Sequence, residues 1–123
     1  MAPACRMHDF PYPSYLRTHR KRWDLTQPEL AALFGGRSAA TISKYEKILR
    51  RPSVDALIAA EFIFGEPARR LFPALYASVE LKVTKRAARF AETLAGRNDK
   101  KALMKRQLLE EIALRAASDR STL

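Results

Sequence analysis

Few residues in this sequence could act as a nucleophile, an acid–base catalyst or a soft metal ligand. Cysteine occurs once, at Cys5, and the two histidines are His8 and His19. These are too few soft ligands for a structural zinc site, and a single cysteine forms no internal disulfide. The chain also lacks a glycine-rich phosphate loop and a paired-carboxylate motif, and neither histidine has a nearby nucleophile-and-acid signature. We therefore expect no enzyme, no metal and no cofactor.

The chain carries a large excess of positive charge. Lys and Arg number 23 against 13 Asp and Glu, a formal net charge of +10. Such a charge attracts polyanions, either nucleic acid or an anionic membrane surface. No apolar run approaches the ~20 residues of a membrane span, and the first residues lack the apolar region of a signal peptide. We expect a cytoplasmic protein without a membrane partner.

The elements that position this charge are predicted to be helices. A length of 123 residues suits one domain with one small core. Apolar residues recur at helical spacing from Ser14 onward, and no run alternates as strands do, so we expect an all-α fold. Three prolines before Ser14 disfavour helix, and residues 1–14 are predicted to be a mobile N-terminal arm.

Helix caps divide the first half of the chain into three short helices. We expect the first to follow Ser14, with Leu16 and Trp23 on its apolar side and a second, basic side. The basic side is Arg17, Arg20, Lys21 and Arg22.

Thr26 is predicted to cap the second helix. This helix is expected to end at Gly35 and Gly36, which can take positive φ, and Ser38 is predicted to cap the third helix. In the third helix Ile42, Tyr45 and the later Leu49 share a predicted core face. Two helices joined in this way form a helix-turn-helix, although a generic helical hairpin has the same spacing.

Three quoted stretches carry a family resemblance. "LTQPELAALF", "SAATISKYE" and "RRPS" together resemble the phage-repressor and Cro-type helix-turn-helix regulators, the XRE family. The resemblance covers about residues 15–72 and implies a compact five-helix, lambda-repressor-like DNA-binding domain, with residues 73–123 forming two further C-terminal helices. It implies a bacterial or phage-type regulator, associated with the nucleoid, that inserts a recognition helix of about residues 38–48 into the major groove of double-stranded DNA.

The resemblance also assigns roles to individual residues. Gln27 matches the family's phosphate-gripping glutamine, and four other residues lie where backbone contacts are expected. These four are Ser38, Lys47, Arg50 and Arg51. The expected base readers are Ala39, Ala40, Thr41, Ser43 and Lys44. Lys44 can donate to guanine and the alanine methyls can touch thymine methyls, but so small a surface suggests reliance on groove shape or water.

Similar proteins pair an arginine of the first helix with a glutamate late in the recognition helix. Arg20 and Glu46 match these positions, which predicts a structural ion pair rather than a DNA contact. The alternative is a solvated surface pair worth under about 1 kcal/mol.

The chain departs from the family pattern at two places. One additional residue between Gln27 and Ile42 predicts a slightly longer turn. Ile48 stands where a helix-ending glycine is common. Because positive φ is costly for a β-branched residue, we expect the helix to continue through Leu49 or Arg50 until Pro52.

The remaining sequence predicts four more helical segments. Ser53 caps the first, 54–64, which Gly65 closes, and Pro67 begins a short helix whose Leu71 and Phe72 pack in the core. The other two are separated by "AGRND", with Asp99 as a cap. Each segment has an apolar stripe at helical spacing. The stripe of the first consists of Leu75, Val79, Val83, Ala87, Phe90 and Leu94. The stripe of the second consists of Leu103, Met104, Leu108, Leu109, Ile112 and Ala116.

These two stripes have to be buried, and two ways of doing so remain open. A twofold homodimer would bury them and suit paired operator half-sites, whereas a hairpin folded onto its own domain would bury them within one chain.

We expect a repressor rather than an activator, because nothing resembles an added sensor domain. Two other classes remain as alternatives. One is an RNA-binding or ribosome-associated basic helical protein, and the other is an antitoxin-like module that binds a protein partner through its C-terminal helices.

Overall fold

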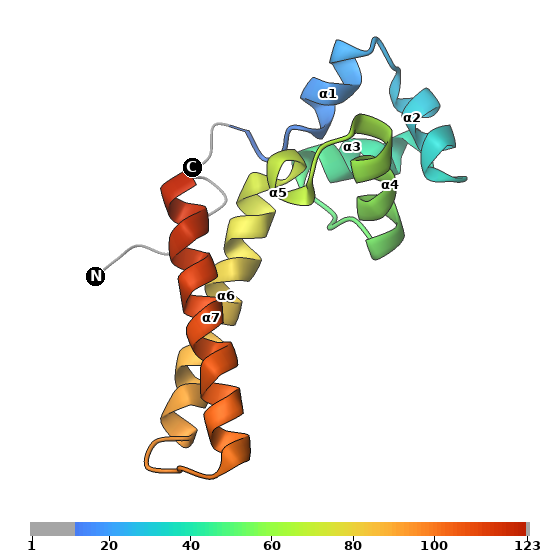
Figure 1. Ribbon diagram of the computed structural model, residues 1–123. Coiled ribbons are helices and arrows are strands. Elements are labelled where there is room, and N and C mark those ends of the chain that lie inside the picture. Colours follow the sequence, from blue (N-terminus) through green and yellow to red (C-terminus); the bar gives the residue numbers. More distant parts are fainter. Residues whose placement is uncertain (1–11, 123) are drawn as a thin grey trace. The chain divides into compact units, whose positions relative to one another are not determined.

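The computed structural model describes residues 12–122, without the side chains of residues 119–122, and this part of the chain is all-helical with no strand. Residues 1–11, with Cys5, His8 and most of the predicted arm, lie outside the described residues. The described residues form seven helices in succession (Figure 1): α1 Leu16–Arg22, α2 Gln27–Phe34, α3 Ala39–Lys47, α4 Val54–Phe64, α5 Ala68–Leu71, α6 Pro73–Thr93 and α7 Lys100–Thr122.

Capping side chains begin most of these helices where the sequence predicts. The Thr26 hydroxyl accepts the Glu29 N–H, while the Glu29 carboxylate accepts the Thr26 N–H at 2.8 Å, a complete capping box for α2. Ser38 and Ser53 accept amide N–H groups of α3 and α4 in the same way. Each cap satisfies a helical N–H that would otherwise lack a partner.

Glycines end α2 and α4 as expected. Gly35, Gly36 and Gly65 have φ values of 93°, 80° and 67°, a conformation that costs glycine little. The residues from Gly35 to Arg37 therefore turn the chain between α2 and the Ser38 cap of α3.

The predicted end of α3 was wrong. The helix ends at Lys47, and Ile48 itself takes the left-handed conformation, with φ 54° and ψ 33°. Ile48 N–H donates to the Tyr45 carbonyl and Leu49 N–H to the Lys44 carbonyl, which are the two bonds of a Schellman motif. The Ile48 side chain packs against the core, whereas Leu49 points outward and is 74% exposed. Tertiary packing thus outweighs the local cost of positive φ at a β-branched residue.

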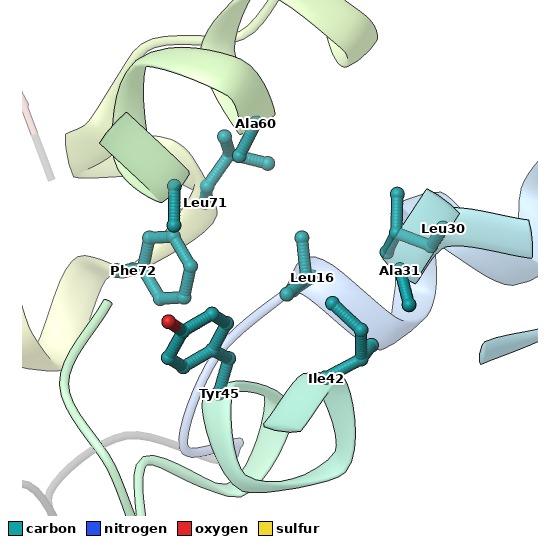
Figure 2. Packing of buried hydrophobic residues seen from close by; sticks show 9 residues of the cluster. Leu16, Leu30, Ala31, Ile42, Tyr45, Ala60, Leu71 and Phe72 are labelled. Carbon is teal, nitrogen blue, oxygen red and sulfur yellow. The ribbon is translucent and has the colours of Figure 1, made fainter. Parts of the chain in front are cut away.

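Nine buried residues form the core shared by α1 to α5. They are Leu16, Leu30, Ala31, Ile42, Tyr45, Ala56, Ala60, Leu71 and Phe72. Figure 2 shows Leu16 of α1 between Ile42 and Tyr45 of α3 on one side and Ala60 and Leu71 on the other. Trp23, expected on the apolar side of α1, is 68% exposed because it follows the last turn of that helix.

Contacts divide the chain into two compact units, one ending at Ser78 and one beginning at Val79, slightly beyond the boundary expected at residue 72. In the second unit, Leu94 directly after α6 packs with Ala102 and Leu109 of α7, and Ala87 and Ala91 of α6 lie against this cluster. Asp99 caps α7, as predicted, accepting the Ala102 N–H at 3.3 Å. The Arg106 guanidinium donates to the Leu94 carbonyl and joins the two helices near this turn.

Tyr45 provides a test of this core, because its ring is fully buried while its hydroxyl has no hydrogen-bond partner among the described residues. Replacing Tyr45 with Phe removes an unsatisfied polar group, so we expect the free energy of unfolding to stay equal or rise by up to about 1 kcal/mol. Tyr45→Ala should lower it by about 3–5 kcal/mol through the cavity it leaves. Urea unfolding followed by circular dichroism measures both; a loss above about 1 kcal/mol in Tyr45→Phe would contradict this reading of the hydroxyl.

Candidate nucleic-acid interface

The centre of the candidate site is a buried ion pair between α1 and α3. Arg20 Nε lies 2.6 Å from Glu46 Oε2 and Arg20 Nη2 lies 3.4 Å from Glu46 Oε1, so the guanidinium approaches the carboxylate side-on. The two side chains are only 9% and 4% exposed. The ion pair expected from the sequence is therefore present and is enclosed, in contrast to the solvated alternative.

Further donors complete this network. Gln27 Nε2, at the start of α2, donates to Glu46 Oε1 at 3.1 Å, and Arg20 Nη1 donates to the Leu25 carbonyl at 2.8 Å. The Ser14 hydroxyl donates to the Glu46 carbonyl at 2.8 Å. Glu46 thus binds α1, the start of α2 and the segment before α1 to one point of α3. Burying two charges is tolerable only with this degree of hydrogen bonding.

The buried face of α3 determines which residues face water. Ile42, Tyr45 and Glu46 are buried, and the predicted base readers occupy the rest of the helix surface. Ala40 and Lys44 are exposed, whereas Ala39, Thr41 and Ser43 are half-buried. The hydroxyls of Ser38 and Thr41 lie 3.1 Å apart and bond each other at the start of the helix.

A cleft of about 980 Å³ adjoins this surface and is formed by α1 with the segments before and after it, the start of α2 and the end of α3. Its lining includes the predicted phosphate ligands Gln27 and Lys47, together with Arg17 and Lys21 of α1. The last two are exposed cations one helical turn apart, so they share a face of α1. Role assignment by family position missed these two residues, although their i, i+4 spacing within the basic side of α1 was a usable signal.

The other predicted backbone contacts lie outside this cleft. Arg50 and Arg51 are exposed and follow the Ile48 turn in the segment before α4, while Ser38 is exposed at the opposite end of α3. The cations Lys44, Lys47, Arg50 and Arg51 thus extend from the solvent face of α3 into the following segment. This arrangement can neutralise phosphates along a strand, because each cation points away from the core.

Comparisons with protein-family models, with curated proteins and with solved structures found no match to this chain. Within residues 12–122, no group of three or more histidine, cysteine, aspartate or glutamate residues is arranged to hold a metal ion. None of the described helices combines the length and apolarity needed to cross a membrane.

Removing one member of the buried pair should destabilise the first unit severely. We expect Arg20→Ala to lower the free energy of unfolding by about 3–5 kcal/mol, because the Glu46 carboxylate would stay buried without its main partner. Arg20→Lys should recover only part of the loss, since an ammonium cannot bond both carboxylate oxygens side-on. Exposed Arg89→Ala is the matched charge control for chemical unfolding. Equal stability of Arg20→Ala and this control would show that the pair contributes nothing.

The capping box of α2 predicts a pH dependence. Hydrogen bonds from the backbone and then from the side chain of Thr26 lower the pKa of Glu29 below its ordinary value of 4.5. A pKa lowered by folding stabilises the folded state above the unfolded value, and this contribution is lost as pH falls through the folded value. Glu29→Ala should therefore lower Tm at pH 7, and the difference from the native chain should narrow below pH 4.5. A constant difference down to pH 3 would contradict this assignment.

Proposed function

We propose that this protein is a helix-turn-helix regulator that binds double-stranded DNA in a sequence-specific manner, with α2 and α3 as the motif and α3 as the recognition helix. The proposal includes a lambda-repressor-like arrangement of α1–α5 and, from the sequence resemblance, membership of the XRE-type regulators. The observation that carries it is the two-sided character of α3. One side of α3 is fixed by the core and the Arg20–Glu46 pair, while the other presents small side chains and Lys44 to solvent.

Two further features support a duplex as the ligand. Gln27 and Lys47 line one basic cleft beside α3, where a phosphate strand can follow the surface. The exposed residues at the start of α3 are Ala40 and the half-exposed Ala39 and Thr41, which let the helix approach base edges closely. In this proposal Lys44 makes the main direct base contact, and groove shape supplies the remaining specificity.

A homodimer is part of the same proposal. On α6 of the second unit Val79, Val83 and Phe90 are 42–44% exposed and recur on one helix face. On α7 Met104 and Leu108 are 64% and 54% exposed, one turn apart. Contact with a second copy would remove this apolar surface from water and bring two recognition helices to paired half-sites. A repressor that acts by excluding other proteins from its operator needs only a DNA-binding helix and a dimer interface.

Selection of bound sequences from a random duplex library at about 150 mM salt tests the proposal. We expect an enriched inverted repeat. Lys44→Ala should relax preference at one position of each half-site, with a loss of about 1–3 kcal/mol of discrimination against other bases. Gln27→Ala should weaken binding to all duplexes by a similar factor, because a phosphate contact reads no sequence.

Ala39→Asp is the complementary variant, since it places a carboxylate against the groove and should abolish operator binding. Melting temperature of each variant serves as the folding control, because Gln27 also bonds Glu46. Binding of every polyanion without an enriched sequence would contradict the proposal. A preference for RNA, or a stoichiometric protein complex that survives high salt, would replace it with one of the two alternative classes.

A further inference from the structure

Arg37 is a residue of the turn between α2 and α3 whose side chain contacts the cap of α4 and an aromatic ring of α3. Its Nη2 donates to Ser53 Oγ at 2.8 Å, and its guanidinium carbon lies 5.9 Å from the centroid of the Tyr45 ring. Ser53 is the cap of α4 and Tyr45 is the buried aromatic residue of α3. One side chain therefore links the turn to two elements of the first unit.

The rest of the turn has few side-chain contacts. A side chain added at Gly35 or Gly36 would meet nothing within 4 Å, so these two residues border open space. Both also take positive φ, a region that glycine leaves easily because its backbone is the least restricted. The Ser38 hydroxyl bonds within α3, to the Thr41 amide and hydroxyl. Among the described side chains from Gly35 to Ser38, Arg37 is therefore the one that connects the turn to Ser53 and the Tyr45 ring.

We infer that Arg37 is a positioning residue that holds the turn and the first residues of the recognition helix in the orientation needed to read bases. The inference rests on the proposed function and extends it to a residue that the sequence did not single out. The guanidinium, which bonds Ser53 and lies over the Tyr45 ring, holds the residue immediately before Ser38. The orientation of Ala39, Ala40 and Thr41 follows, because these residues begin the helix that Ser38 caps.

The enclosure of one donor of the half-buried Arg37 side chain favours this role over a direct phosphate contact. Its Nε is enclosed and has no hydrogen-bond partner among the described residues. A guanidinium that extends to DNA keeps its donors in water until it binds, whereas this one is partly withdrawn into the protein. Arg37 therefore acts on the duplex through α3.

The first measurement requires no DNA. Hydrogen exchange of the free protein should show the Thr41 and Ile42 amides, which bond Ser38, exchanging about tenfold faster in Arg37→Ala than in the native chain, because the contacts of the guanidinium with Ser53 and the Tyr45 ring are lost. Arg89→Ala, which removes an exposed cation of α6, is the charge-matched control and should leave these amides unchanged. Unchanged exchange in Arg37→Ala would overturn the inference.

The second measurement uses the duplex selected by the native chain and an unrelated duplex. Arg37→Ala should reduce the ratio of the two affinities about tenfold while leaving the salt dependence unchanged. Arg37→Lys should restore little of this ratio, since an ammonium lacks the planar stacking surface. Tyr45→Phe keeps the ring beneath Arg37 and should keep the ratio.

The outcomes distinguish failure of the inference from failure of the proposed function. An equal loss on both duplexes, with rescue by lysine and a salt slope lower by about one, would make Arg37 a phosphate contact and overturn the positioning role. A native chain that selects no duplex sequence would overturn the proposed function, and the positioning role with it. A selected sequence whose ratio is unaffected by Arg37→Ala would overturn the inference alone.

Discussion

The Arg20–Glu46 pair is the interaction on which the architecture of the first unit depends. A carboxylate that is 4% exposed has to be charge-compensated and hydrogen-bonded, and its donors come from α1 and the start of α2. The bonds to Arg20 and Gln27 fix both elements against the last turn of α3. Glu46 also precedes Lys47 and the Ile48 turn, so the end of α3 and the entrance to the basic cleft are fixed together.

This fixed side gives the opposite side of α3 its proposed role. A helix held by a hydrogen-bonded pair and by Ile42 and Tyr45 has little freedom to roll, so its solvent-facing residues keep a defined orientation. Small side chains at Ala39 and Ala40 contribute little reach, and precise placement then matters more than the strength of any single contact. In the proposed function, the small residues of α3 read bases only if the helix is held in place. The buried Arg20–Glu46 network holds its last turn, and the proposed role of Arg37 is to hold its first.

Local chemistry accounts for what the sequence predicts well. Thr26, Ser38, Ser53 and Asp99 cap helices because each hydroxyl or carboxylate reaches a nearby amide, an interaction confined to four residues of sequence. Gly35 and Gly65 end helices for equally local reasons. Ile48 and Arg37 are different, because their conformations depend on the core, the Tyr45 ring and Ser53, contacts between residues distant in sequence. The Arg20–Glu46 pair, 26 residues apart, was predictable only through family resemblance.

The second unit has a small buried core and large exposed apolar residues. Its core contains Leu94, Ala102 and Leu109, and the alanine contributes little apolar area, so the packing between α6 and α7 is thin. Larger apolar residues, including Phe90, Met104 and Leu108, remain 44–64% exposed on these helices. A hairpin that leaves several large apolar residues exposed would gain stability by burying them on association, since burial free energy scales with apolar area. In the proposed dimer, formation of the interface and folding of the hairpin are therefore coupled, and the stability of the second unit depends on protein concentration.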